Sequence, residues 1–467
     1  MLHRVNVTWD TAQRLGSQAP NPVNSYKILN SSTPPSPKVR LNLPPALSYY
    51  AASSAIPAAA SRESLAGELR ADVAVVGGGL AGCSAALHLA QRGFKVALLE
   101  AHCVGYGASG RSGGQMIFGL AAGQKALAAR VGREDAHRLF DLSIEALDLS
   151  QALIRDHRID CDYKPNHVHV ATKPRHLGEL GEWAEELHGE YGYESARLLD
   201  RRELEAHVNS ERYLGGIIDT RSGHLHPLKY TQGLARAAEQ AGARIFENTQ
   251  ALHYEEGLEV VVRSAHGTLR CRHLVLCANA YIGSLAPALA RRILGVGTYI
   301  IATEPLAPAR ARALLPSNAA VADINWILDY FRLSADSRLL FGGRVSYSAL
   351  QPPHLAESMR RRLVRVFPQT ADLKVEYAWG GYLDITMSRA PDFGRLAPNV
   401  FYLQGFSGHG MSLTALAGKV VAEAVAGTAE RFDVFARLPH RDFPGGPLLR
   451  RPSLVLAMLY YRLKDLL

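Results

Sequence analysis

The pattern of apolar and polar positions is clearest from residue 72 onward. A short apolar strand over residues 72–76 is followed by three adjacent glycines, an amphipathic helix over residues 81–92 and a second apolar strand over residues 95–100. This order predicts a strand–helix–strand unit of about 30 residues. The apolar stretch 73–90 has the length of a membrane span, but its glycines favour a strand and a turn. We therefore predict no stable insertion into a membrane.

Further along the chain, local periodicity predicts several more elements. Helical spacing of apolar residues predicts helices over residues 125–158, 177–191, 227–241 and 412–425. Short apolar or alternating runs predict strands over residues 167–171, 243–247, 252–262, 269–277 and 400–403. Residues 274–278 are apolar throughout, as expected of a strand buried on both faces of a central sheet. The stretch 295–376 alternates apolar and polar residues in places, which predicts a second, largely antiparallel sheet.

Composition and charge are typical of a globular protein and argue against several other classes of function. With 467 residues, of which 47% are hydrophobic and 20% charged, the chain is long enough for two or three domain-sized cores. The 52 Lys and Arg exceed the 43 Asp and Glu, but the basic residues are scattered. We interpret the charge of +9 as a solvated surface and expect no nucleic-acid partner. The five cysteines form no CxxC pair, which argues against a zinc ribbon and against a redox dithiol, and favours a reducing, cytoplasmic location.

The glycines after the first strand have the GxGxxG spacing of a dinucleotide-binding turn. The first permits a tight turn, the second lets the backbone approach a pyrophosphate, and the third lets helix and strand pack closely. The positive end of the helix that follows stabilises the phosphates. An acid at the end of the second strand accepts hydrogen bonds from ribose hydroxyls and disfavours a 2′-phosphate, which argues against NADP. The residues expected around the adenosine half are Gly77, Gly79, Leu80, Ala81, Gly82, Glu100 and Ala101.

Two further segments favour FAD over NAD as the dinucleotide. FAD is the longer molecule, so it needs a second loop along its pyrophosphate and ribityl chain and a third contact at the isoalloxazine ring. The Gly/Ser-rich loop 105–115 offers backbone N–H groups and hydroxyls for the second contact, although a flexible surface loop is the alternative. The turn 405–411 opens the last long helix, whose N-terminus would stabilise negative charge on the flavin. The residues expected at these two contacts are Gly107, Ala108, Ser109, Gly113, Gly114, Gln115, Gly408, His409, Gly410 and Met411.

Taken together, these motifs resemble the D-amino-acid-oxidase-type superfamily of FAD-dependent oxidoreductases. The resemblance rests on the glycine turn with Glu100, the loop 107–115, and the segments 223–228, 388–396 and 405–410. Within the superfamily it is greatest toward bacterial gamma-glutamylputrescine oxidoreductases, and it covers most of the chain beyond the N-terminal extension. Two positions depart from the family pattern: Ser112 stands where Asn is expected, and Ala251 where a Val backbone meets the adenine. Both changes are small, so they affect affinity for FAD rather than its use.

The resemblance implies oxidation of a small-molecule amine, gamma-glutamylputrescine or a related gamma-glutamyl polyamine. A hydride would pass to the flavin, the imine would be hydrolysed to an aldehyde, and dioxygen would regenerate FAD and yield hydrogen peroxide. A protonated nitrogen has no lone pair to assist the departing hydride, so the site needs a neutral amine and an apolar wall. The aromatic candidates for that wall, each of which is alternatively plain core, are Trp326, Tyr330, Trp379 and Tyr382.

Two single residues have alternatives of their own. Arg332 is a candidate for binding the glutamyl carboxylate through two parallel hydrogen bonds, with a solvated surface pair as the alternative. His409 either adds a hydrogen bond to the flavin or only shapes its turn. The sequence identifies no general base. Other functions that the motifs permit are a glycine, sarcosine or D-amino-acid oxidase or dehydrogenase of the same superfamily, and a non-catalytic dinucleotide-binding protein.

The elements and motifs together predict an α/β fold. We expect a discontinuous Rossmann-like FAD-binding domain and a mainly antiparallel-sheet substrate domain threaded through it. The FAD-binding domain is assigned to residues 70–160, 217–290 and 377–435, and the substrate domain to residues 161–216 and 291–376. Residues 1–48 are rich in Ser, Pro and Asn and predict a disordered extension, with a misassigned start and an organelle transit peptide as alternatives. Residues 436–467 form a C-terminal tail, whose part 454–467 either packs on the protein or lies on a membrane as an amphipathic helix.

Overall fold

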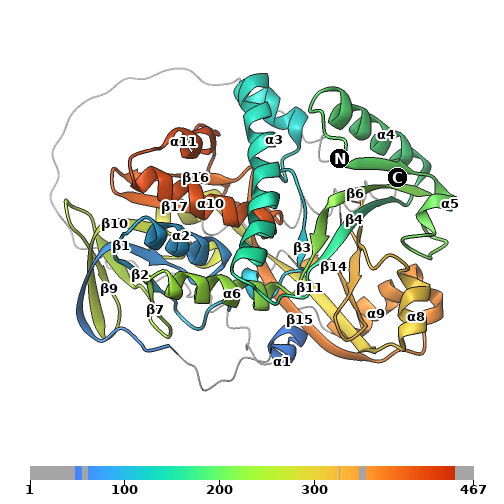
Figure 1. Ribbon diagram of the computed structural model, residues 1–467, viewed down its shortest axis with the longest axis horizontal. Helices are drawn as coiled ribbons and strands as arrows, with labels where there is room; N and C mark the ends of the chain where they lie inside the picture. Colours follow the sequence, from blue (N-terminus) through green and yellow to red (C-terminus); the bar gives the residue numbers. More distant parts are fainter. Residues whose placement is uncertain (1–47, 55–61, 326, 347–353, 447–467) are drawn as a thin grey trace.

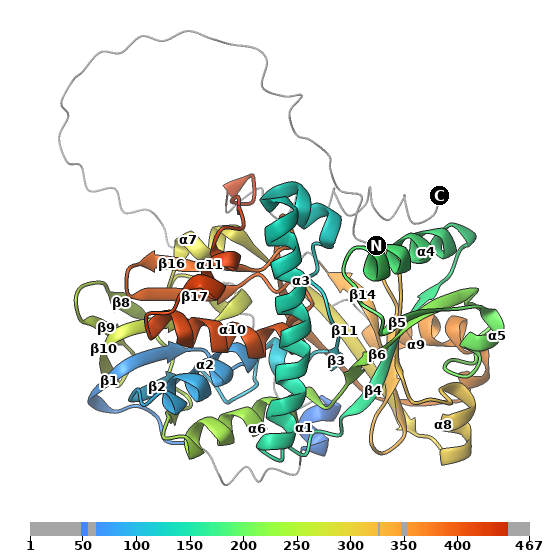
Figure 2. The ribbon, with the colours of Figure 1, turned by 45° about the horizontal axis from the view of Figure 1, so that its top comes forward.

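The computed structural model describes residues 48–54, 62–325, 327–346 and 354–446 (Figure 1). The predicted extension up to residue 47, the segment 454–467 and Trp326 lie outside the described residues. Within them the chain forms two large sheets, drawn on the left and on the right of Figure 1, with the long helix α3 (Gln124–Asp156) between them in both views (Figures 1 and 2). This arrangement agrees with the predicted α/β class.

The first sheet has eight strands in the order β16-β17-β10-β1-β2-β7, with β9 pairing with β10 and β8 with β9. Its central strands run parallel: β1 (Gly67–Val76), β2 (Val96–Leu99), β7 (Arg244–Phe246), β10 (Gly267–Leu276) and β17 (Val400–Gln404). The flanking strands are antiparallel to their neighbours: β8 (His253–Glu255), β9 (Val260–Arg263) and β16 (Asp392–Ala397). All four residues of β2 are buried, as expected of a parallel strand covered on both faces.

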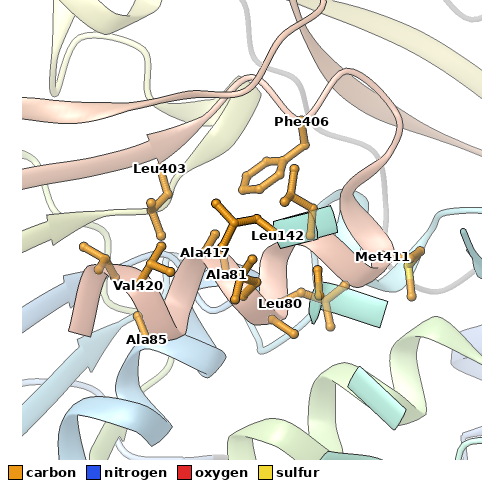
Figure 3. Close-up of a cluster of buried hydrophobic side chains, with 14 of the residues drawn as sticks. Leu80, Ala81, Ala85, Leu142, Leu403, Phe406, Met411, Ala417 and Val420 are labelled. Atoms are coloured by element: carbon orange, nitrogen blue, oxygen red, sulfur yellow. The ribbon is translucent and has the colours of Figure 1, made fainter. Parts of the chain in front are cut away.

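Helices cover this sheet and form the larger hydrophobic core. On one face α2 (Leu80–Gln91) packs between α6 (Pro227–Gln240) and α10 (Gly410–Val425), and α10 also contacts α3. Figure 3 shows side chains of α2, α3, β17 and α10 meeting in this core; among those labelled are Leu80, Leu142, Leu403 and Val420. The short helices α7 (Pro287–Arg292) and α11 (Glu430–Ala436) flank the sheet. Small residues let α2 and α10 approach closely: a Cβ on Gly418 would lie 2.4 Å from the backbone N of Ala85.

The second sheet has nine strands in the order β15-β11-β14-β13-β12-β4-β6-β3, with β5 pairing with β6. Of the strand pairs described in it, β12–β4 is parallel and the others are antiparallel. The strands are β3 (Gln115–Met116), β4 (Lys164–Ala171), β5 (Ala196–Leu199), β6 (Gly215–His224), β11 (Ile293–Pro305), β12 (Ala320–Asp323), β13 (Tyr330–Leu333), β14 (Arg338–Ser346) and β15 (Val375–Thr386). The largely antiparallel second sheet is thereby confirmed.

Helices α4 (Pro174–Gly189), α5 (Arg201–Leu204), α8 (Pro308–Leu314) and α9 (Leu355–Val366) accompany this sheet, on the right of Figure 1. The five-residue helix α1 (Tyr49–Ser53) packs near α6, and its Tyr50 is fully buried. The predicted helices over residues 81–92, 177–191, 227–241 and 412–425 are confirmed by α2, α4, α6 and α10, and the one over residues 125–158 by α3, which a kink at Gly132 (φ +83°) divides.

Two expectations need correction. The single strand expected over residues 252–262 is two strands, β8 and β9, joined by a turn at whose tip Leu258 is fully exposed. Glu255, Glu256 and Gly257 interrupt the apolar pattern at this turn, and the prediction did not use that signal. Residues 217–224 and 377–386, expected in the FAD-binding domain, lie in β6 and β15 of the second sheet. Pairing partners far along the chain decide that membership, and local periodicity does not contain them. The remaining domain boundaries stay a prediction.

Candidate functional site

The glycine turn after β1 is packed so closely that side chains are excluded from it. Gly77 has φ +113°, and a Cβ there would lie 2.6 Å from the carbonyl oxygen of Cys277 at the end of β10. A Cβ on Gly79 would lie 2.8 Å from Ser109 Oγ, and one on Gly82 only 1.9 Å from the carbonyl oxygen of Gly77. The turn is therefore a bare backbone at the carboxyl ends of parallel strands, where such sheets bind ligands.

Glu100 stands beside this turn at the end of β2. Its Oε2 accepts a hydrogen bond from Gly78 N at 2.7 Å, and its Oε1 accepts one from His102 N at 2.9 Å. Burial raises the pKa of the Glu100 carboxyl, and the two backbone donors oppose that shift. The chain from residue 248 returns to the same place, since Thr249 N donates to the carbonyl oxygen of Glu100 at 2.8 Å. This brings the buried Ala251 and the exposed Ala101 to the same end of the sheet.

The loop 105–115 joins the glycine turn to the second sheet. At one end, Gly105 N donates to the carbonyl oxygen of Gly78 at 2.9 Å, and Ser109 Oγ accepts from Leu80 N at 2.9 Å. At the other end, Gly114 has φ +71°, and its carbonyl oxygen accepts from Leu225 N at 2.8 Å. The 3-10 turn Ala108–Gly110 lies between these ends, and Gln115 begins β3. The loop is ordered by the protein on both sides, which argues against the flexible-loop alternative.

The third predicted contact lies next to this loop. Ser112 Oγ donates to Met411 Sδ at 3.2 Å, so the two segments touch although they are 299 residues apart in the chain. Gly408 has φ +94° and is exposed, and α10 begins at Gly410 with His409 as an N-cap that gives no side-chain hydrogen bond. The first N–H groups of a helix have no intrahelical partner, so this end is suited to bind an anionic or polar group.

His409 remains a neutral side chain at physiological pH. Burial lowers its pKa to about 4, and the charge of Arg389 acts in the same direction. Its Nδ1 finds no hydrogen-bond partner among the residues that the structure describes. The residue as a whole is partly accessible, although its Nδ1 is buried.

Arg332 is buried, so the alternative that it forms a solvated surface pair is wrong. Only 4% of the residue is exposed, and its guanidinium donates from Nε to Gly113 O at 2.7 Å and from Nη1 to Leu333 O at 3.1 Å. Its Nη2 donates to the hydroxyl of Tyr50 at 3.0 Å. Arg332 thus attaches the loop 105–115 to β13 and α1. Its role toward a substrate carboxylate stays a prediction.

The aromatic candidates that the structure describes lie on β13 and β15, and Tyr330 and Trp379 contact the same loop. The ring of Tyr330 fills the space beside two glycines: a Cβ on Gly113 would lie 2.6 Å from it and one on Gly342 only 2.0 Å. Trp379 is buried, and its Nε1 donates to the carbonyl oxygen of Arg111 at 3.0 Å. Tyr382 is also buried and meets Tyr281 edge to face, with ring centroids 6.3 Å apart.

Two histidines of β4 belong to this region and were missed. His167 Nε2 lies 3.2 Å from Gln115 Oε1, and the rings of His167 and His169 have centroids 4.4 Å apart. Burial lowers the pKa of His167 to about 3 and that of His169 strongly, and the charge of His409 contributes to both shifts. All three imidazoles are therefore neutral, and the rings of His167 and His169 are in contact. The signal was present in the sequence, because these two polar residues alternate with the buried Val168 and Val170 of the same strand.

These three chain segments fit a long dinucleotide. The glycine turn leaves no room for a Cβ, Glu100 is oriented beside it, and partly accessible residues continue along the loop 105–115 to Gly408 and His409. In the parts of the chain that the structure describes, no group of three or more His, Cys, Asp or Glu side chains is arranged to hold a metal ion. Over the same ranges, no helix is both long enough and apolar enough to cross a membrane.

Comparisons with known proteins agree with this geometry. A family model described as FAD dependent oxidoreductase (DAO) matches residues 72–424. The chain is 41% identical over 419 residues to the gamma-glutamylputrescine oxidoreductase of Escherichia coli (strain K12), an alignment that covers 90% of this chain and 98% of that protein. It is 40% identical over 400 residues to the probable oxidoreductase OrdL of Haemophilus influenzae, covering 85% and 92% of the two chains.

Among solved structures, glycine oxidase from Bacillus cereus ATCC 14579 superposes with a TM-score of 0.66, covering 79% of this chain and 99% of that one. Its sequence identity is 21%, so this likeness concerns the fold alone.

Proposed function

Because this chain belongs to the family of FAD-dependent oxidoreductases, we propose that it oxidises the amine of a gamma-glutamyl polyamine, with gamma-glutamylputrescine as the substrate to test first. The observation that carries the proposal is the 41% identity to a gamma-glutamylputrescine oxidoreductase over nearly the full length of both chains. The family is FAD-dependent and its relatives oxidise amines, so the alternative of a non-catalytic dinucleotide-binding protein is set aside.

We propose that three segments hold FAD. The glycine turn with Glu100 would bind the adenosine half, the loop 105–115 the pyrophosphate and ribityl chain, and the turn 405–411 the isoalloxazine ring. Support comes from the backbone packing of the glycine turn and from the contact between Ser112 and Met411, which joins the second segment to the third. When bound, FAD supplies the acceptor for a hydride from the carbon that bears the amine.

The side chains near the third segment favour a neutral amine. His409, His167 and His169 add no positive charge to the site at neutral pH, because burial keeps their pKa values low. A neutral imidazole nitrogen with an open lone pair, such as Nδ1 of His409, can accept a hydrogen bond from an amine. The aromatic rings on β13 and β15 reduce the local polarity. We infer that the site orients an uncharged amine and excludes water, rather than activating a nucleophile.

The proposed overall reaction consumes amine, dioxygen and water and yields aldehyde, ammonia and hydrogen peroxide, one molecule of each. The carbon loses two electrons with the hydride, the imine takes up one water, and dioxygen accepts the two electrons with two protons. Because only the neutral amine reacts, kcat/KM should rise with pH toward the pKa of the substrate amine. A flat pH profile over that range would contradict the requirement for a neutral amine.

A substrate panel under anaerobic conditions tests the proposal. Gamma-glutamylputrescine is expected to bleach the flavin absorbance of the holoenzyme, whereas putrescine, glycine, sarcosine and D-alanine react more slowly by at least about 1.4 kcal/mol in activation free energy, a factor of ten in rate. Bleaching by sarcosine or glycine but not by gamma-glutamylputrescine would assign the chain to the small-amino-acid oxidases instead. Admitting air should then restore the absorbance with one hydrogen peroxide per aldehyde; slow reoxidation in air would remove dioxygen as the acceptor.

A further inference from the structure

We propose that Asp384 is a positioning residue that anchors the turn 405–407, and through it the N-terminus of α10, to strand β15 of the second sheet. The inference rests on the proposed function, which places the isoalloxazine ring of FAD at the N-terminus of α10. Asp384 lies in β15, and nothing in the sequence motifs singles it out.

Successive backbone N–H groups of the turn converge on this one residue. Gly405 N makes a short hydrogen bond to Asp384 Oδ2, and Phe406 N donates to the same oxygen at 3.3 Å. Ser407 N donates to the backbone carbonyl oxygen of Asp384 at 3.1 Å. Gly405 and Ser407 have φ of +80° and +51°, in the left-handed region. In this conformation the N–H groups of the turn face Asp384 in β15. Concave arrangements of successive N–H groups are binding sites for anions.

Burial of the Asp384 carboxylate costs desolvation free energy, which argues for a specific role of this side chain. Asp384 is 2% exposed, and no Lys, Arg or His pairs with it among the ion pairs of the described residues. Burial raises its pKa to about 7 against the opposing effect of the backbone donors. An uncharged acceptor such as Asn would satisfy the same N–H groups at a smaller desolvation cost.

Strand β15 also contacts the loop 105–115, the second segment of the proposed FAD site. Trp379 Nε1 donates to Arg111 O at 3.0 Å, and Arg111 Nη1 donates to Gly380 O at 3.4 Å. Strand β15 of the second sheet thus binds the loop 105–115 near the middle of the strand and the turn 405–407 near the end of the strand. Asp384 accepts hydrogen bonds from the N–H groups of residues 405–407, which precede the helix. The helix α10 itself begins without a side-chain cap, so its first N–H groups are left to bind another group. Asp384 therefore sets the position of the N-terminus of α10 relative to the aromatic side chains on β13 and β15.

The test compares Asp384→Ala and Asp384→Asn with a matched control, Asp219→Ala. Asp219 is 1% exposed and accepts backbone N–H groups from Arg221 and Ser222, but it lies in β6, away from the turn. We measure the dissociation constant of FAD with apoprotein, the melting temperature of the apoprotein, and amide hydrogen exchange over residues 405–412.

Asp384→Ala should weaken FAD binding about tenfold or more and speed exchange over residues 405–412, because its turn loses two of its three acceptor contacts. Asp384→Asn retains an acceptor oxygen and should bind FAD within about threefold of the wild type, a rescue that a general loss of stability would not show. Asp219→Ala should lower the melting temperature of the apoprotein without changing exchange in the turn.

Unchanged exchange and unchanged FAD affinity in a folded Asp384→Ala protein would overturn the proposal. If that variant does not fold, wild-type apoprotein decides: the amides of Gly405, Phe406 and Ser407 should be protected, and exchange as fast as in an open loop overturns it. Failure of the substrate proposal is distinct, since the holoprotein would then bind FAD normally but not react with gamma-glutamylputrescine.

Discussion

The glycines of the turn after β1 differ in what a methyl group would meet. At Gly79 the nearest atom is the rotatable hydroxyl of Ser109, whereas at Gly82 it is the backbone carbonyl oxygen of Gly77, 1.9 Å away. A hydroxyl can move aside, but that carbonyl is fixed between β1 and α2. We therefore expect Gly82→Ala to displace α2 from the turn and to leave a protein that retains no FAD after gel filtration.

A matched glycine separates this effect from substitution in general. Gly178 lies inside α4 with no atom within 4 Å of its hypothetical Cβ. Gly178→Ala should raise the free energy of unfolding by about 0.5–1 kcal/mol and leave FAD content unchanged. Full FAD occupancy in Gly82→Ala would show that the turn does not need the close packing seen here.

Asp323 at the end of β12 gives a pH-dependent prediction. Its Oδ1 accepts from Asn325 N at 3.0 Å, and its Oδ2 has no partner within the described ranges. Burial and the charge of Asp329 raise its pKa to about 7. In the unfolded chain the value is about 3.9, so the folded state binds this proton more tightly. The sign follows: this carboxyl costs no stability below about pH 4, and stability is lost as the pH rises to about 7.

Asp323→Asn removes the titration and retains the acceptor for Asn325. The free energy of unfolding of the variant, relative to the wild type, should increase between pH 5 and pH 7 by about 1.4 kcal/mol per pH unit. Urea denaturation at several pH values measures this difference. Parallel curves for the two proteins would mean that Asp323 is ionised normally in the folded state.

At the scale of single residues, the need for glycine could be predicted where the backbone itself imposes it, while the contacts of these glycines with FAD stay a prediction. Gly77 and Gly82 follow from spacing alone, because no side chain fits at those positions. Arg332 was recognised as important, but its partners Gly113 and Tyr50 are 219 and 282 residues away in the chain, so the sequence could not show that it is buried among them.

At the scale of elements, Tyr49 and Tyr50 hold α1 to the second sheet, and Tyr50 is the more deeply buried of the two. Tyr50 is 0% exposed; its ring meets Trp379 edge to face at 5.1 Å, and its hydroxyl accepts from Arg332 Nη2 at 3.0 Å. Tyr50→Phe retains the ring and removes the acceptor. The free energy of unfolding should fall by about 1 kcal/mol because a buried charged donor loses a partner. Tyr377→Phe, whose ring contacts with Tyr49 and Arg338 are kept, is the control in the same urea denaturation series. Equal losses in both variants would argue against a specific role of the Tyr50 hydroxyl.

Element types were predictable to the extent that they depend on local periodicity. The helices α2, α6 and α10 have apolar positions at helical spacing, and the parallel strands of the first sheet contain short, continuous apolar runs. The order of the second sheet has no such basis: β4 pairs with β6 on one side and with β12, about 150 residues later, on the other. The assignment of β6 and β15 to the wrong domain has the same cause.

At the scale of the whole molecule, the proposed cofactor would connect parts of the chain that are far apart in sequence. The glycine turn, the loop 105–115 and the turn 405–411 lie in different elements, and the second and third meet through Ser112 and Met411. A ligand that binds only the folded state stabilises it by about 2.7 kcal/mol at one hundred times its dissociation constant. FAD at that excess should therefore raise the melting temperature of the apoprotein.

Comparison of FAD with ADP tests whether one molecule spans all three segments. ADP contains the adenosine half and the two phosphates, so it should slow hydrogen exchange near Gly78 and Glu100 but leave residues 405–411 unchanged. FAD should protect both regions, because its isoalloxazine ring would reach the end of α10. Equal protection of residues 405–411 by ADP would mean that the two ends of the site are coupled through the protein, and protection by FAD of the first region alone would place the ring elsewhere. The distinction matters for the amine as well, since the neutral histidines and the aromatic wall adjoin the substrate only if the ring lies beside them.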